Sequence, residues 1–170
     1  MRARIAAFLL AFFSAFAHAS WQEAVPDARV SGEGDLRFLG LRIYNAKLWT
    51  PGGKWAEGAP FALELTYHRS ISRDRFVSTS LDEIRRIQGG AVSEAQLESW
   101  AAEMRRGFVD VSPGERIVGV FLPGQGCRFY AGNRLQHEVR DPAFARAFFA
   151  IWLDPRTRDQ GLRQKLLGAG

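Results

Sequence analysis

The sequence predicts an α+β domain in which helices cover one face of an antiparallel sheet. Three observations point to this class. Strand-like and helix-like segments fall in separate blocks along the chain. Residues 61–68 alternate apolar and polar side chains, as a half-buried strand does. Two later segments, 72–89 and 93–108, place apolar residues at helical spacing.

The first residues read as a secretory signal peptide. Two arginines near the start precede an apolar run over residues 5–16, which Ala17-His18-Ala19 follows as a cleavage site. A helix that spans a bilayer needs roughly 20 apolar residues, so this run is too short for a stable membrane anchor. We therefore expect a signal peptide over residues 1–19, cleavage near Ala19, one mature domain over 20–170, and a periplasmic or secreted protein.

Composition argues against nucleic acid as a partner. The 23 basic and 18 acidic residues give a net charge of +5, and the basic residues are scattered among acids. Nucleic-acid binders instead cluster their positive charge to neutralise adjacent phosphates. The densest basic segment, residues 69–75, includes an acid and opens a helix, as a solvated helix terminus does. The single cysteine, Cys127, permits no internal disulfide and reads as a half-buried, unreactive side chain.

The first β block follows a polar lead over residues 31–34. Residues 35–50 predict extended structure, either one long bent strand or two successive strands, which Pro51-Gly52-Gly53 ends. Residues 61–68 form the clearest strand. One face of that strand carries Phe61, Leu63, Leu65 and Tyr67, and the other carries Ala62, Glu64, Thr66 and His68.

Two helices come next. Ser72 is suited to cap the first, which ends at Gly89-Gly90, and Ser93 opens the second with the capping-box sequence Ser-Glu-Ala-Gln. Apolar stripes of this kind are core faces far more often than cofactor sites. The first stripe consists of Phe76, Ser80, Ile84 and Ile87, and the second of Leu97, Trp100, Ala101, Met104 and Phe108.

A second β block and a helical end complete the chain. Short turns join the predicted strands 116–122, 127–131 and 135–139, which indicates an antiparallel meander. Asp141-Pro142 then opens a helix that carries Phe144, Phe148, Ile151 and Trp152 on one face. After Asp154-Pro155 the chain restarts toward a last helical turn that Gly168 ends.

Several kinds of chemistry have no motif in the sequence. His68 and His137 stand far apart and lack the spacing of metal ligands, so no metal site is expected. There is no G-x-S-x-G elbow, no phosphate-binding glycine loop and no dinucleotide fingerprint. We therefore expect no catalytic residue of a known motif and no cofactor.

Four blocks of the chain resemble bacterial chalcone isomerase-like proteins. The resemblance implies an open-faced β-sandwich, in which helices cover a large antiparallel sheet. It also implies a cleft between sheet and helices, which in plant relatives either cyclises a chalcone or holds a fatty acid. The blocks are Phe38–Trp49, Leu63–Arg69, Arg128–Tyr130 with Asn133, and Phe144–Pro155, of which the F-F-x-I-W-L-D-P sequence is the most specific.

The resemblance also shows where this chain departs from the plant enzymes. Those enzymes carry a threonine where Tyr44 stands, and a tyrosine and an asparagine on the first helix at the positions of Phe76 and Glu83. Their catalytic arginine has no clear counterpart in residues 32–35. The nearest arginines are Arg29 and Arg37. Because the reaction needs placed donors to stabilise an oxyanion, each loss weakens the isomerase interpretation.

Three functions stay open. The first is a non-enzymatic binder of an apolar or fatty-acid-like small molecule, with Arg42 and Tyr44 on one strand face to grip a carboxylate. The alternative reading is that the aromatic residues fill the core and Arg42 points to water. The others are an interaction module for an envelope protein and an isomerase acting on a chalcone. The expected ligand-binding residues are Phe38, Arg42, Tyr44, Trp49, Tyr67, Phe76, Phe129 and Phe148.

Overall fold

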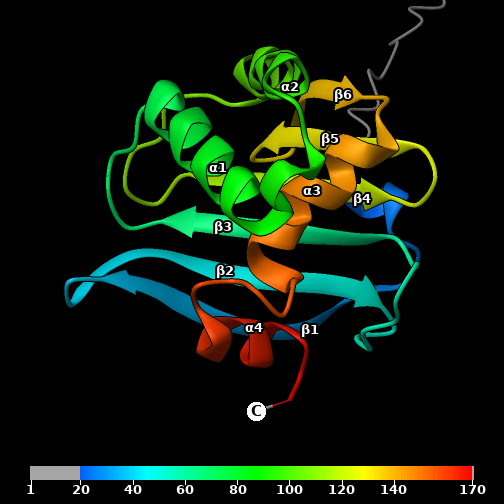
Figure 1. Cartoon of the computed structure of the whole chain (residues 1–170). Helices are drawn as coiled ribbons and strands as arrows, with labels where there is room; N and C mark the ends of the chain where they lie inside the picture. The colour runs from blue at the N-terminus through cyan, green and yellow to red at the C-terminus, as the bar shows by residue number, and fades with distance from the viewer. Residues whose placement is uncertain (1–19, 170) are drawn as a thin grey trace, which may run out of the picture.

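The computed structural model describes residues 20–169, so the expected signal peptide lies outside the described residues. One antiparallel sheet with the strand order β1-β2-β3-β4-β5-β6 carries the helices on one face (Figure 1). This confirms the predicted α+β class. The elements are η1 (Trp21–Ala24), β1 (Ala28–Phe38), β2 (Leu41–Pro51), β3 (Phe61–Tyr67), α1 (Arg73–Gln88), η2 (Gly89–Ala91), α2 (Glu94–Gly107), β4 (Arg116–Leu122), β5 (Gly126–Ala131), β6 (Arg134–Val139), α3 (Pro142–Leu153) and α4 (Gln160–Leu166).

The first β block is a long hairpin. Strands β1 and β2 pair antiparallel, and only Leu39 and Gly40 connect them. Both residues have left-handed backbone, with φ of 49° and 79°, which is the conformation of a tight two-residue hairpin turn. Residues 35–50 were predicted to form either one long bent strand or two successive strands, and the second prediction is correct. The polar lead over residues 31–34 was misassigned, because it lies inside β1.

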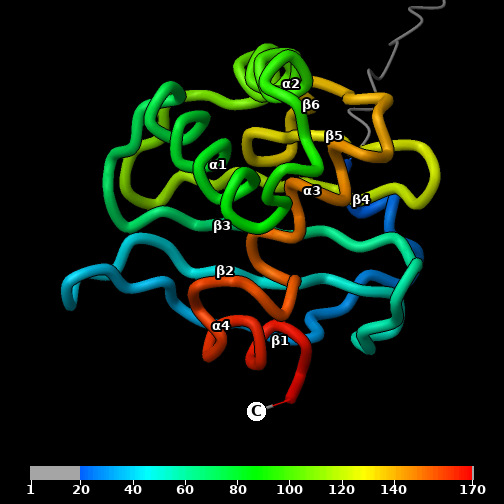
Figure 2. Tube along the Cα trace, in the orientation of Figure 1, coloured from blue at the N-terminus to red at the C-terminus, as the bar shows by residue number. Residues whose placement is uncertain are grey.

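Two glycines in β1 are explained by a helix from the other end of the chain. A side chain at Gly32 would overlap the backbone oxygen of Lys165, and one at Gly34 would come within 2.9 Å of the Leu162 Cδ1 atom. Figure 2 shows α4 lying beside β1 and β2. The glycines therefore let the backbone of α4 approach the sheet directly, which a strand with larger side chains would prevent.

The helix starts are capped as the sequence predicts. The Ser72 hydroxyl accepts the N–H of Arg75, and the Ser93 hydroxyl accepts the N–H of Gln96. Asp141 accepts two N–H groups at the start of α3. These side chains satisfy backbone donors that have no partner within the helix.

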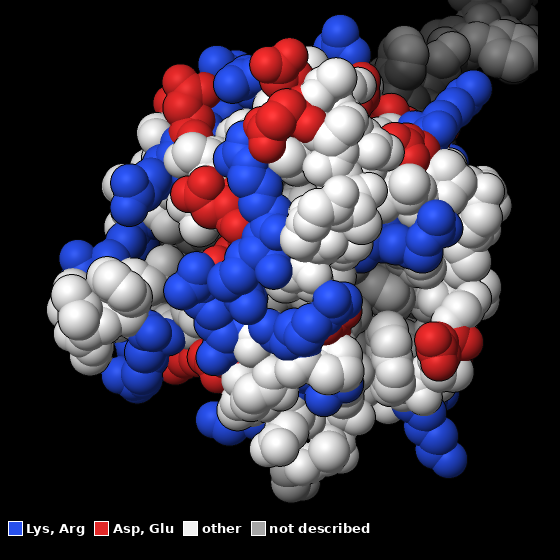
Figure 3. Space-filling model, in the orientation of Figure 1, with Lys and Arg blue, Asp and Glu red and all other residues white. Residues whose placement is uncertain are grey.

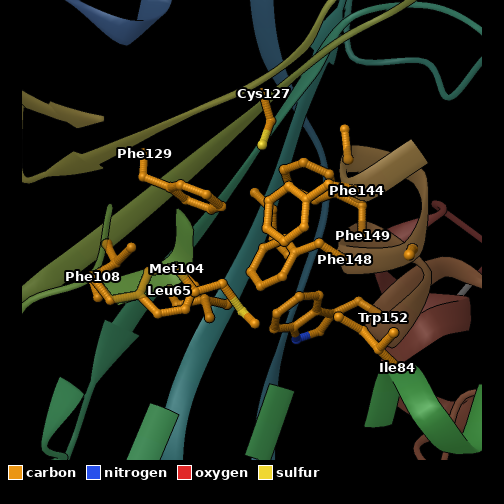
Figure 4. Packing of buried hydrophobic residues seen from close by; sticks show 14 of the residues in the cluster. Leu65, Ile84, Met104, Phe108, Cys127, Phe129, Phe144, Phe148, Phe149 and Trp152 are labelled. Carbon is orange, nitrogen blue, oxygen red and sulfur yellow. The ribbon is translucent and has the colours of Figure 1, made fainter. Parts of the chain in front are cut away.

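The region between the central strands and the helices is packed solid. Rings from α3 and β5 contact one another at centroid distances of 5.2–6.2 Å, and most of these pairs are edge-to-face (Figure 4). Only about 10 Å³ of free space is left among them. The principal aromatic residues are Phe108, Phe129, Phe144, Phe148, Phe149 and Trp152.

The opposite face of the sheet carries a second, smaller core. Trp21 of η1 and the adjacent Val25 are buried against side chains of β3, β4 and β5. Trp49 belongs to this face, where its ring lies 5.4 Å from that of Trp21. The helix-free face is therefore covered at its centre by the first described turn of the chain.

Cys127 is more buried than the sequence suggested. It was expected to be half-buried, but only 1% of its surface is exposed. Burial raises the pKa of its thiol well above the ordinary value. Within residues 20–169, none of the helices has the length and hydrophobicity that crossing a bilayer requires.

Candidate functional site

A cavity of about 930 Å³ opens beside the packed core. It lies among the hairpin ends of β1 and β2, the end of β3, helix α1, and the segment that runs from α3 into α4. Its volume falls in the range of about 300–1,000 Å³ that is typical of small-molecule pockets. The apolar walls consist of Leu36, Phe38, Ile43, Tyr44, Tyr67, Ile71, Phe76, Ile151, Trp152 and Leu162.

Three aromatic side chains form the floor of this cavity. The indole Nε1 of Trp152 donates a hydrogen bond of 2.8 Å to the hydroxyl of Tyr44. The Tyr67 ring stands edge-on to Tyr44 at a centroid distance of 5.7 Å. Its hydroxyl is buried and has no hydrogen-bond partner among the described residues. Burial raises the pKa of both phenols, so both stay neutral at physiological pH.

Helix α1 supplies one wall through residues two turns apart. Phe76 and Glu83 both face the cavity, so the two positions where plant enzymes carry a tyrosine and an asparagine do lie in its wall. Phe76 contacts the rings of Tyr67 and Phe108. It offers no hydroxyl to a ligand.

Glu83 is held by arginines rather than left free. Its carboxylate accepts hydrogen bonds from Arg86 at 2.7 Å and from Arg158 at 2.5 Å. Burial disfavours its charge, but the two arginines outweigh that cost and hold its pKa below the ordinary value. Glu83 therefore serves as an ionised anchor at the cavity wall and has no proton to donate at neutral pH.

The segment between α3 and α4 is tied to the end of α1. Arg156 donates to the backbone oxygen of Ile87 at 2.8 Å, and Arg86 donates to the backbone oxygen of Arg156 at 2.9 Å. Asp154 fixes Arg156 by accepting from its guanidinium and its backbone N–H, and the same contacts lower the pKa of Asp154. The W-L-D-P sequence thus places Trp152 in the floor and the adjoining loop in the wall.

The charged lining is mainly positive. Four arginines and two carboxylates face the cavity, and both carboxylates are engaged: Glu83 by arginines and Asp159 by the N–H of Leu162. By contrast, Arg69 and Arg75 form no ion pair with any other residue of the segment 20–169. Figure 3 shows basic side chains gathered over the middle of this face, where α1 meets the α3–α4 segment. The arginines are Arg37, Arg69, Arg75 and Arg158.

The structure brings together half of the expected ligand-binding residues. Phe38, Tyr44, Tyr67 and Phe76 line the cavity. The other four do not. Phe129 and Phe148 lie in the solid core, Trp49 faces the opposite side of the sheet, and Arg42 points away from the cavity.

The expected pairing of Arg42 with Tyr44 is wrong because of a β-bulge. Leu36 pairs with Tyr44 and Arg37 with Arg42, which leaves Ile43 as an extra residue in β2. Arg42 therefore leaves the face of Tyr44 and forms an ion pair of 2.9 Å with Asp35. Hydrogen bonds from Asn45 and Arg42 hold the pKa of Asp35 below its ordinary value.

Several lining residues were not expected from the sequence. Arg69 and Arg75 belong to the basic segment that read as a solvated helix terminus, yet both border the cavity. A signal for them existed, because that segment is the densest cluster of arginine in the chain. Ile43 and Leu162 carried no such signal, since their places depend on the bulge and on the packing of α4. Ile71 carried none either, because its place is set by a bridge to Val111, which is distant in sequence.

Within residues 20–169, no three side chains of the types His, Cys, Asp and Glu lie close enough together to hold a metal ion. His68 instead lies 4.0 Å from Asp35, at the edge of an ion-pair distance. His137 contacts Glu103 of α2. These two histidines thus each have a carboxylate neighbour.

Comparisons with known proteins agree with this architecture. The model of the family described as chalcone isomerase-like matches residues 44–168. An uncharacterized protein of Haemophilus influenzae is 28% identical over 161 residues, which cover 94% of this chain and 74% of that protein. The solved structure of a fatty-acid binding protein of Arabidopsis thaliana superposes with a TM-score of 0.63 at 14% identity, over 84% of this chain and 88% of that one. The last likeness shows a shared fold.

Proposed function

Since this chain belongs to the chalcone isomerase-like family, we propose that it is a non-enzymatic binder of an apolar small molecule with an anionic head group, such as a fatty acid. The cavity beside the core is the binding site in this proposal. The single observation that carries it is the combination of apolar walls with two arginines, Arg69 and Arg75, that form no ion pair among the described residues. The fatty-acid binding protein that shares the fold supports the ligand class.

The two ends of such a ligand have matching surroundings in the cavity. An acyl chain gains free energy by leaving water for contact with side chains such as Phe76, Ile151 and Leu162. A carboxylate suits a guanidinium, which donates parallel hydrogen bonds to both of its oxygens. Arg69 and Arg75 are the arginines available for this contact, because Arg158 is bound to Glu83 and Arg37 lies 4.0 Å from Asp35.

Two features of the wall favour binding without catalysis. Phe76 offers no hydroxyl where the plant enzymes have one. Glu83 is ionised and held by two arginines, so it does not act as a neutral donor. Stabilising an oxyanion requires donors aimed at the point where charge develops, and these residues do not supply that set.

We also propose that the protein acts outside the cytoplasm, in the bacterial periplasm or as a secreted protein. The support is the order of features in residues 1–19: a charged start, a short apolar run and an A-x-A site. Detection of a mature terminus at Ser20 in the protein recovered from the periplasm would agree with this. An intact Met1 terminus in the cytoplasmic fraction would contradict it.

Native mass spectrometry of the full chain, purified without detergent, tests the binding function. The expected spectrum contains a second species heavier by the mass of one acyl acid, which organic extraction removes. A spectrum of the unliganded chain alone, unchanged after incubation with dodecanoate, would contradict the proposal. Release of a cyclised product from a chalcone would instead favour the isomerase.

A further inference from the structure

The tip of the β1–β2 hairpin exposes a group of apolar side chains. We define the hairpin tip as residues 37–42. Leu39 is 85% exposed, Phe38 is 65% exposed and Leu41 is 47% exposed. Figure 1 shows this end of the hairpin extending beyond the rest of the sheet, and in Figure 3 the same edge of the molecule carries a white, uncharged lobe. These three residues contribute little to the core, so the fold alone does not account for them.

The turn itself adds a second observation. Leu39 has a φ of 49°, in the left-handed region where a bulky residue is strained. Two-residue turns of this kind favour Asn, Asp or Gly at that position because those residues tolerate the conformation. A leucine at this position strains the backbone and also exposes an apolar side chain to water. Its presence is understandable when the side chain meets an apolar environment outside the chain.

Positive charge surrounds the apolar tip. Arg37 and Arg42 are part of it, and Arg69 lines the same cavity as Arg37. Asp35 is the acid nearby, and it faces two of these arginines, Arg42 at 2.9 Å and Arg37 at 4.0 Å. The surroundings of the tip therefore keep an excess of positive charge, which is complementary to a negatively charged surface.

The tip is also continuous with the cavity. Arg37 and Phe38 belong to both, because they line the cavity and lie next to the turn. Anything that covers the tip therefore also borders the cavity. An amphipathic ligand could pass between that surface and the cavity without crossing open water.

We propose that the hairpin tip docks on an anionic lipid surface. Phe38, Leu39 and Leu41 enter the interface between head groups and acyl chains, and the neighbouring arginines contact lipid phosphates. The role in ligand transfer rests on the proposed function, whereas the docking contact itself is tested separately. Insertion of an apolar tip flanked by basic residues requires no membrane-spanning segment.

A fluorescent label at the turn tests this contact directly. Because Cys127 is buried, a Leu39→Cys variant of the full chain can be labelled selectively with an environment-sensitive dye such as NBD. Leu135→Cys provides the control, since Leu135 is a 47% exposed leucine on β6, the opposite edge strand. On vesicles of phosphatidylglycerol and phosphatidylethanolamine, the dye at position 39 should brighten and shift to the blue. The dye at position 135 should not change.

A substitution that suits the turn separates docking from folding. Leu39→Asn places a favoured residue in the left-handed position, so the protein should fold at least as well as the wild type. Its partition onto the anionic vesicles should fall about tenfold, the loss expected from one leucine side chain. Leu135→Thr should leave partition unchanged, and residues 1–19 are the same in every variant. Vesicles of phosphatidylcholine alone should bind the wild type more weakly.

The outcomes distinguish the alternatives. A dye at position 39 that stays in water while the chain binds vesicles overturns the proposal, as does equal partition of Leu39→Asn and wild type. A tip that responds only to a second copy of the chain or to another protein also overturns it. Dodecanoate binding measured on the same variants separates the two proposals: loss of docking with binding retained contradicts this inference alone.

Discussion

The hydroxyl of Tyr44 on β2 and the indole of Trp152 on α3 are joined by a hydrogen bond of 2.8 Å at the floor of the cavity. The bond connects residues 108 positions apart, and it links the Phe38–Trp49 block to the W-L-D-P block, two of the blocks that carry the family resemblance. Trp152 is only 7% exposed, so its indole N–H depends on Tyr44 as its acceptor, and the bond fixes the two rings relative to each other.

Loss of the Tyr44 hydroxyl should destabilise the fold. In a Tyr44→Phe variant the buried Nε1–H of Trp152 has no acceptor, which costs about 1–3 kcal/mol in the free energy of unfolding. Tyr67→Phe is the matched control, because the Tyr67 hydroxyl has no partner among the described residues and its removal should be neutral or slightly stabilising. Urea unfolding measures both. Equal losses in the two variants would contradict the role given to Tyr44.

A methyl group at Gly32 should disturb the wall that α4 forms. The added carbon overlaps the backbone of Lys165, and overpacking of this kind costs about 1–3 kcal/mol in the free energy of unfolding. Gly90→Ala is the control, since a side chain there meets no atom within 4 Å. Thermal unfolding of Gly32→Ala and Gly90→Ala compares them. If Gly32→Ala unfolds at the wild-type temperature, α4 does not pack on β1 as described.

Much of the fold is readable from local sequence. Ser72, Ser93 and Asp141 each stand before an apolar stripe of helical period, and each caps the helix expected after it. The apolar face predicted for residues 61–68 does lie in the main core, and Ala62 on the other face belongs to the smaller core. These features depend on neighbours within a few positions, so a short stretch of sequence contains the necessary information.

The errors come from contacts that are distant in sequence. Gly32 and Gly34 read as a loop because the helix that requires them begins more than 120 residues later. The bulge at Ile43 turns Arg42 away from the face that carries Tyr44, and no residue of β2 indicates this bulge in the sequence. The assignment of Trp49 to the cavity was an avoidable error. Trp49 lies five positions from Tyr44, and strict alternation places the two residues on opposite faces of the strand.

A Glu83→Gln variant should lose less stability than the wild type when the pH is lowered. The pKa of Glu83 is lowered by its arginines, so its contribution is present above the ordinary value of 4.5 and disappears as the pH falls through the lowered value. Glu83→Gln should therefore be less stable than the wild type at about pH 7, and the difference should close as the pH falls through the lowered pKa of Glu83. Unfolding by urea across this range measures it.

Glu98→Gln serves as the control for this pH dependence, because Glu98 is an exposed residue of α2. It should follow the wild-type curve at every pH. A constant difference between Glu83→Gln and the wild type, from neutral to acid, would show that the loss comes from packing and not from charge.

Cys127 should be inert in the folded protein. Burial raises the pKa of its thiol and shields it from solvent, so Ellman's reagent should react only as fast as the chain opens. In denaturant the same thiol should react at the rate of a free cysteine. Full reaction of the native protein within the time of mixing would contradict the packing of this strand.

Calorimetric titration of two variants with dodecanoate tests the central claim most directly. Thr79 lines the cavity from α1, so Thr79→Trp should fill part of the space and abolish binding, whereas Ser78→Trp, one residue away and outside the lining, should bind like the wild type. Dodecanol should bind the wild type more weakly than dodecanoate, because it lacks the charge for Arg69 and Arg75. Equal binding of dodecanoate by both tryptophan variants would contradict the assignment of this cavity as the ligand site.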